Sequence, residues 1–313
     1  MYKLEIILHN AIKFLFMLLG LVPRNLANGT AGFMGKILFL FDRKHRRIAM
    51  DNLTYAFGDQ KSPDEIRILA RQNFINLLKL VFEIGWSLNL DKKRLVTHFT
   101  IDGRSNIRKA YEKGKGVLAL TAHLGNWELL TVIAEMIEYP LSIVVRPLDL
   151  KPLDRFFVNL RTRFGAKIIP RQRSFREILR SLGRGEMVAL LMDQNVDWYE
   201  GVFVDFMGHR ACTSSGMALL AIKTGAPVVP VFLVREKTGF RAEFGAEIPT
   251  VNTGDRRKDI ETNTRQYNRV IEDFIRRYPD QWFWVHQRWK TKPYQAWDEN
   301  SDKNYTEAVP KSL

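Results

Sequence analysis

The chain contains almost no cysteine. Cys212 is the one cysteine among its 313 residues. A single cysteine excludes a disulfide within the chain and a cysteine-rich metal site, and it fits a reducing compartment. The sequence also has no internal repeat and no low-complexity linker, which argues against a repeat array.

Acidic residues are scarce relative to basic ones. The 34 Asp and Glu face 48 Lys and Arg, which gives a formal net charge of +14. Such an excess calls for an anionic partner, such as nucleic acid, anionic lipid or an acidic protein. Nucleic acid is the usual partner of a basic chain, but the sequence has no zinc, RNP or basic-zipper signature. A nucleic-acid-binding protein is therefore kept only as an alternative.

The sequence also lacks a long uninterrupted hydrophobic run. Its most apolar stretch, residues 4–22, is broken by His9, Asn10 and Lys13. Because about 20 apolar residues are needed to cross a bilayer, this stretch is marginal as a membrane span. It has no small-residue cleavage site, which argues against a removed signal peptide.

A second apolar patch, residues 33–41, is followed directly by the basic cluster 43–47. Basic clusters beside apolar helices suit the anionic cytoplasmic leaflet of a membrane. A core helix with a solvated charged end is the alternative. We expect residues 1–45 to form helices associated with the membrane.

What the sequence does contain is one strongly patterned stretch, residues 114–136. It has a short apolar run at 117–122, then His123, then a break at Gly125 and Asn126. An amphipathic helical pattern follows the break. The pattern predicts a buried strand, a tight loop and a helix, with His123 at the carboxyl end of the strand, where open α/β sheets carry their chemistry.

Glu128 lies five residues after His123. The break between them lets His123 lie ahead of the helix while Glu128 sits in its first turn. We expect Glu128 to accept a hydrogen bond from one imidazole nitrogen, which leaves the other nitrogen free as a base. No Ser or Cys nucleophile lies beside them, so the base would act on a hydroxyl or a water that comes with the substrate. The water would make the protein a hydrolase.

Three further apolar runs end in polar residues. The runs at 141–145, 166–170 and 187–192 are followed by Arg146, Arg171 and Asp193. Strands alternate with helical patterns along the chain, which predicts an α/β fold with a central, mostly parallel or mixed sheet flanked by helices. Asp193 suggests a metal ligand, but no third ligand lies at a metal-site spacing, so no metal is expected.

Basic residues are concentrated between Arg161 and Arg184. This stretch has eight Lys or Arg and one acidic residue, Glu177. The imbalance exceeds what local ion pairs can neutralise. Since the planar guanidinium group matches phosphate oxygens, we expect some of these arginines to hold a phosphate.

The segment HLGNWE, which contains His123 and Glu128, resembles the H-x4-D/E motif of the glycerolipid and lysophospholipid acyltransferase superfamily. More narrowly, the chain is similar to the bacterial lipid A biosynthesis acyltransferases, which add secondary lauroyl or myristoyl chains. Other matching segments are RRIAMDNLTYAF at 46–57, the block that begins at Asp193, and WFWVHQRWKTKP at 282–293.

The resemblance implies roles for particular residues. His123 and Glu128 would form the catalytic pair. Arg161 and Arg171 match basic positions of the family and would bind acceptor phosphates, with Arg146 as a further candidate. Asp193 would order the arginines or a substrate sugar. The acyltransferase domain would cover residues 46–297, with a disordered tail at 298–313.

The resemblance also implies an activity and its setting. The enzyme would transfer a fatty acyl group from the thioester of acyl-carrier protein, an acidic partner, to a hydroxyl of a phosphorylated glycolipid, a lipid A precursor. It would need no cofactor, would not bind nucleic acid, and would work at the bilayer of the cell inner membrane with its active site on the cytoplasmic side. Phosphatidylinositol mannoside and lysophospholipid are the alternative acceptors.

Overall fold

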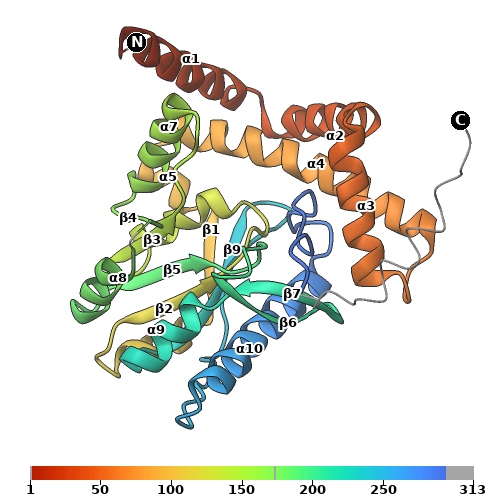
Figure 1. Cartoon of the computed structure of the whole chain (residues 1–313). Coiled ribbons are helices and arrows are strands. Elements are labelled where there is room, and N and C mark those ends of the chain that lie inside the picture. Colours follow the sequence, from red (N-terminus) through yellow and green to blue (C-terminus); the bar gives the residue numbers. More distant parts are fainter. Residues whose placement is uncertain (1, 173, 294–313) are drawn as a thin grey trace, which may run out of the picture.

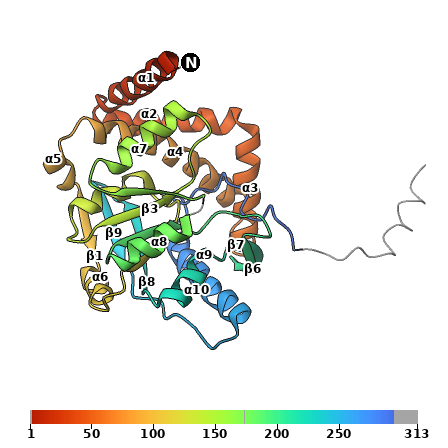
Figure 2. The same cartoon turned by 60° about the vertical axis from the view of Figure 1, so that its left-hand side comes forward.

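A computed structural model describes residues 2–172 and 174–293 (Figures 1 and 2). Within these residues the centre is a seven-stranded sheet with the order β1-β9-β8-β2-β5-β3-β4. Strands β2, β3, β4, β5 and β8 run parallel to one another, and β9 runs antiparallel to β8. The predicted α/β class with a mostly parallel, mixed sheet is confirmed. The strands of this sheet are β1 (Phe99–Asp102), β2 (Val117–Thr121), β3 (Leu141–Val145), β4 (Lys167–Pro170), β5 (Met187–Leu191), β8 (Val228–Arg235) and β9 (Phe240–Phe244).

Both faces of the sheet are covered, which explains why its central strands are apolar without interruption. On β2, Leu118 and Leu120 belong to the core on one face, whereas Val117 and Ala119 belong to the core on the other. The first face packs under α8 (Ser174–Gly183), α9 (Gly216–Thr224) and α10 (Arg256–Arg277), and the second under α6 (Arg104–Tyr111) and η1 (Trp127–Glu135).

A separate layer of helices comes from the N-terminal part of the chain and lies at the top and right of Figure 1. Its centre is the long helix α4, which packs against the three helices before it. A capping box formed by Ser62 and Glu65 begins α4. The layer consists of α1 (Tyr2–Gly20), α2 (Arg24–Phe41), α3 (Arg43–Phe57) and α4 (Pro63–Leu88).

Helices α1 and α2 meet at a sharp bend. Their axes differ by 112°, and Gly20 at the end of α1 lies directly on Gly85 of α4. A Cβ atom on Gly20 would come within 2.1 Å of the Gly85 carbonyl oxygen, so only glycine permits this approach. Among the described residues, no single helix is long and apolar enough to cross a bilayer, but the bent pair of α1 and α2 passes that test by length and composition.

Large apolar side chains cover the outside of this bent pair. Phe14 of α1 is 63% exposed, and Phe33 and Phe41 of α2 are 67% and 80% exposed. Such a concentration of exposed apolar groups is unusual for a surface in contact with water and marks an interaction site.

The remaining elements connect these two parts. Helix α7 packs between α1 and the sheet edge at β4, and a two-stranded antiparallel hairpin packs on α10. These elements are α5 (Lys92–Val96), α7 (Lys151–Thr162), β6 (Gly201–Phe206) and β7 (His209–Ser214).

The helix expected after the break at Gly125 and Asn126 is a 3-10 helix. Pro230 lies in a central strand and not at an edge. It is tolerated because it lies where β8 exchanges partners, at the last residue paired with β2 and just before the first residue paired with β9. The predicted tail at 298–313 lies outside the described residues.

Candidate active site

The loop after β2 is fixed in place by the C-terminal segment of the described chain. Gly125 has a φ of 63°, and a Cβ atom there would lie 1.9 Å from the carbonyl oxygen of Leu233. Its N–H donates to the carbonyl of Gln281 at 3.0 Å, and the N–H of Phe283 donates to the carbonyl of His123 at 3.0 Å. This tight turn places His123 at the carboxyl edge of the sheet, as the sequence predicted.

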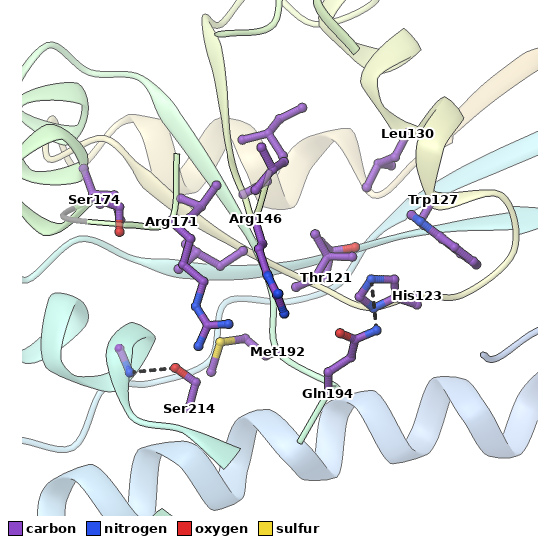
Figure 3. Close-up of a pocket in the computed structure, with 18 of the residues that line it drawn as sticks. Thr121, His123, Trp127, Leu130, Arg146, Arg171, Ser174, Met192, Gln194 and Ser214 are labelled. Atoms are coloured by element: carbon purple, nitrogen blue, oxygen red, sulfur yellow. Dashed lines mark hydrogen bonds between the residues drawn. The ribbon is translucent and has the colours of Figure 1, made fainter. Parts of the chain in front are cut away.

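Asp193, at the end of β5, is the carboxylate that holds the His123 side chain. Nδ1 of His123 lies 2.9 Å from Oδ1 of Asp193, and the backbone N–H of His123 donates to Oδ2 at 3.0 Å. The indole of Trp282 donates to the same Oδ2 at 2.7 Å. Asp193 accepts a hydrogen bond from Nδ1 of His123. The neutral imidazole therefore has its proton on Nδ1, which leaves Nε2 without a proton and directed at the cavity (Figure 3).

Asp193 stays ionised although its side chain is only 1% exposed. Burial raises the pKa of Asp193, but the charge and hydrogen bonds of His123 and the hydrogen bond from Trp282 outweigh burial and lower it. A buried carboxylate that bonds the rear nitrogen of an imidazole fixes its tautomer and stabilises its protonated form.

The hydrogen bond expected between His123 and Glu128 is not what the structure shows. Glu128 is turned towards α7, where its carboxylate accepts hydrogen bonds from Nε and Nη2 of Arg161, both at 2.8 Å. The indole of Trp127 donates to Glu128 at 3.1 Å. The first turn of η1 therefore directs Glu128 away from the imidazole, and a catalytic role for Glu128 stays a prediction.

Arg161 is held by the same two hydrogen bonds to Glu128. Its side chain is only 14% exposed. Burial alone would lower the pKa of Arg161, but the Glu128 carboxylate outweighs burial and raises it. A bidentate, buried pair of this kind holds its partners in one geometry.

The other two arginines predicted to bind substrate lie nearer to solvent. Arg171 forms an ion pair with Glu200 and is 45% exposed, whereas Arg146 lies 3.8 Å from Asp149 and is 74% exposed. Both line the same cavity as His123. Arg161 lines this cavity too, but the greater exposure of Arg146 and Arg171 places them better to meet an anionic group entering from solvent.

Four of the eight basic residues between Arg161 and Arg184 form ion pairs with acids that lie outside this stretch. The buried carboxylate of Glu186 forms ion pairs with both Lys167 and Arg184. Glu128 and Glu200, which also lie outside the stretch, form ion pairs with Arg161 and Arg171. The sequence count missed these pairs because the acids lie far away along the chain or just beyond the stretch.

A cavity of about 980 Å³ opens at the carboxyl edge of β2, β3 and β5. Figure 3 shows His123, Gln194, Arg146 and Arg171 at this edge. The side-chain nitrogen of Gln194 lies 3.4 Å from Nε2 of His123. The walls below are mostly aliphatic, so the site combines an oriented base with room for hydrocarbon.

The pairing of His123 with Asp193 follows from the sequence only once β2 and β5 are known to be neighbours. Thr121 and Leu191 are paired in neighbouring parallel strands, and His123 and Asp193 follow them by two residues each. Equal offsets from one register position bring two side chains together. The part played by Trp282 had no such signal, because it depends on a contact 89 residues away.

Comparison with known proteins gives a consistent result. A family model described as "Bacterial lipid A biosynthesis acyltransferase" matches residues 2–291. A lipid A biosynthesis acyltransferase of Haemophilus influenzae is 27% identical over 89% of this chain and 86% of its own length. A lipid A biosynthesis lauroyltransferase of Escherichia coli is 27% identical over 83% and 84%. A phosphatidylinositol mannoside acyltransferase of Mycolicibacterium smegmatis is 26% identical over 64% and 65%.

Proposed function

Because this chain belongs to the bacterial lipid A biosynthesis acyltransferase family, we propose that it moves a fatty acyl chain from an acyl-carrier-protein thioester to a hydroxyl of a phosphorylated lipid A precursor. The observation that carries this proposal is the cavity itself. An imidazole held by a buried carboxylate stands at the mouth of a space lined with aliphatic side chains. That combination suits proton transfer beside a hydrocarbon substrate.

In the proposed reaction, Nε2 of His123 takes the proton from the acceptor hydroxyl as its oxygen attacks the thioester carbonyl. Asp193 stabilises the imidazolium that forms. The tetrahedral intermediate then collapses, the C–S bond breaks, and His123 returns the proton to the departing phosphopantetheine thiolate. In this scheme the amide of Gln194, close to Nε2, donates to the negative oxygen of the intermediate.

Glu128 acts in this scheme through its neighbours. Its pair with Arg161 ties η1 to α7, and its bond with Trp127 positions that indole, whose ring centre lies 5.1 Å from that of His123. We assign Glu128 and Arg161 a structural role, which is to hold η1 in place beside His123. We assign the binding of the acceptor phosphate to Arg146 and Arg171. Phosphate binding would require Arg171 to leave Glu200. A phosphate dianion that accepts two hydrogen bonds from the guanidinium can replace the single carboxylate.

The cavity is linked to the N-terminal helices through α7, which lies beside α1 in both views (Figures 1 and 2). The loop from Pro147 to Asp149 lines the cavity and leads into α7. Helix α1 packs on α7, where Phe16 and Phe156 stack with their ring centres 4.6 Å apart. We propose that α1 and α2 hold this face in the cytoplasmic leaflet of the inner membrane, so that a lipid acceptor reaches His123 from the bilayer.

The decisive experiment is transfer by the purified enzyme from acyl-carrier-protein donors to a lipid A precursor, followed by mass spectrometry. Acylated precursor and its loss in His123→Ala support the proposal. Free fatty acid released equally well without acceptor would identify a hydrolase instead. A phosphatidylinositol mannoside acceptor is run in parallel, since one relative carries that name, and acylation of that acceptor alone would replace the lipid A assignment.

A further inference from the structure

A small hollow lies between α2 and α4, apart from the active site. It shares no lining residue with the cavity at His123. Each helix contributes side chains spaced three or four residues apart, which places them on one face of that helix. They include Arg24, Ala27 and Asn28 of α2 and Lys79, Glu83 and Trp86 of α4.

The hollow is framed by two close contacts with α4. Gly20, just before the bend, lies on Gly85, and a Cβ atom on Gly35 of α2 would lie only 2.6 Å from Cα of Ile75. The residues of α2 that line the hollow come between these two contacts in the sequence. The hollow is therefore a feature of tight helix packing and not of a loose loop.

Lys79 brings an uncompensated positive charge into this hollow. Its side chain is partly buried, and no residue within 2–172 or 174–293 forms an ion pair or a hydrogen bond with its ammonium group. Burial lowers the pKa of Lys79, because the charged form has lost water without gaining a partner. An anion in the hollow would supply that partner.

Arg24 enters the same hollow and is already held in position. Its guanidinium carbon lies 4.6 Å from the ring centre of Trp86, and its Nη1 donates to the carbonyl of Thr238 at 3.1 Å. It too has no ion-pair partner among the residues that the structure describes. A guanidinium that is ordered before binding loses little conformational entropy when it receives a ligand.

The carboxylate of Glu83 on the wall does not neutralise these two cations. It forms a bidentate ion pair with Arg235. Asp280 attracts Lys79 but does not form an ion pair with it in the described chain. The hollow therefore keeps an excess of positive charge from Lys79 and Arg24, which favours an anionic ligand.

The size and surroundings of the hollow indicate what kind of anion it would take. Its volume is about 30 Å³, compared with about 10–15 Å³ for one water molecule, so it admits the oxygen atoms of a phosphate but no hydrocarbon chain. Leu21 and Leu26, on either side of Arg24 in the sequence, are 69% and 63% exposed. Basic pockets between membrane-associated helices suit the head groups of anionic lipids.

We propose that this hollow binds the phosphate of an anionic phospholipid, with Lys79 and Arg24 donating to the phosphate oxygens and the acyl chains lying over Leu21 and Leu26. The lipid would be a component of the bilayer and not a reactant, because the hollow and the active-site cavity share no lining residue. A bound head group would fix the orientation of the bent helices at the membrane surface, which apolar attachment alone does not do.

The test is native mass spectrometry of the full-length protein in a neutral detergent, titrated with dioleoyl phosphatidylglycerol. Lys79→Met and Arg24→Met should each weaken binding of the first lipid by about tenfold or more, the loss expected for a hydrogen bond to a charged group. Lys79→Arg should retain binding. Lys36→Met and Arg71→Met remove the same charges from exposed positions of α2 and α4 outside the hollow, and they should bind the lipid as wild type does.

Thermal unfolding verifies that each variant is folded, and Arg24→Met decides the test if Lys79→Met does not fold. Wild-type affinity in both hollow variants, or an equal loss in the Lys36 and Arg71 controls, would overturn the site. Displacement of the lipid by inorganic phosphate at the same concentration would assign the hollow to free phosphate and overturn the assignment to a phospholipid.

Discussion

At the scale of single residues, the proposed mechanism depends on the pair of His123 and Asp193. Two groups that meet at 2.9 Å, one of them a buried and ionised carboxylate, can hold an imidazole ready to accept a proton. The same geometry gives Glu128 a different task, because its oxygens are already engaged by Arg161 and Trp127.

Asp193→Asn should lower kcat by about a hundredfold or more, since general acid–base catalysis is worth roughly 10²–10⁴-fold. The amide cannot stabilise the imidazolium and favours the wrong tautomer. The measurement is turnover with saturating donor and acceptor. Asp197→Asn is the control, because Asp197 is exposed and bonds Tyr199; its kcat should equal that of wild type. An active Asp193→Asn enzyme would remove Asp193 from the mechanism.

Glu128→Met should lower the free energy of unfolding by about 3–5 kcal/mol, because it leaves the buried Arg161 charge unpaired. The double variant Glu128→Met with Arg161→Met should recover most of that loss, measured by chemical denaturation. Its activity then separates two roles for Glu128. If activity returns together with stability, Glu128 only holds η1 in place. If the double variant is stable but inactive, the charge of Glu128 takes part in the reaction.

At the scale of elements, Glu186 ties three pieces of the fold together. Its carboxylate accepts from Ser142 of β3, Lys167 of β4 and Arg184 after α8. Burial raises the pKa of Glu186, but these hydrogen bonds outweigh burial and lower the pKa to about 2. The stabilisation is therefore complete above the ordinary pKa of a glutamate, 4.5, and is lost as the pH falls through 2.

Glu186→Gln should consequently have a lower Tm than wild type at pH 7. Between pH 5 and pH 2 the two Tm values should converge, since wild type alone loses this contribution. Glu247→Gln is the control, because Glu247 forms a half-exposed ion pair with Lys113 and such pairs contribute little. A gap between Glu186→Gln and wild type that stays constant down to pH 2 would contradict the prediction.

The bent pair of α1 and α2 is the element that should bind the bilayer. Replacing Phe14 and Phe33 together by Asp should shift the protein from the pellet to the supernatant when it is sedimented with anionic lipid vesicles. Both side chains are exposed, so the fold should be retained. Ile68→Asp, which changes an exposed apolar residue of α4, should leave sedimentation unchanged.

Sedimentation in high salt then separates the two contributions. Apolar attachment survives the salt, whereas attachment through the basic cluster 43–47 alone would be lost. Equal sedimentation of wild type and the Phe14 and Phe33 variant would rule out these helices as the membrane-binding element.

At the scale of the whole molecule, the central sheet was largely predictable and the site only partly so. The apolar runs at 117–122 and 141–145 identify buried strands, because a strand covered on both faces needs no polar alternation. The partners of Glu128 were not predictable, since spacing along the chain says which groups can meet but not which way the first turn of η1 faces. The partner of His123 depends on strand order, which local patterns do not encode.

The division into a membrane part at 1–45 and a catalytic part after it stays a prediction. Helix α1 packs on α4 and α7 and therefore contacts the catalytic part extensively. Sequence composition identified the apolar helices, but the bend between α1 and α2 depends on their packing against α4.

The attachment of the segment around Trp282 has a consequence for how the protein matures. Asn52 of α3 and Asn73 of α4 donate to the backbone carbonyls of Trp284 and Trp282, and Trp282 in turn holds Asp193. The site is thus completed by residues that are synthesised more than 200 residues after their partners in α3 and α4. During synthesis the N-terminal helices would therefore form first, and His123 and Asp193 would lack these orienting contacts until residues 281–283 are added.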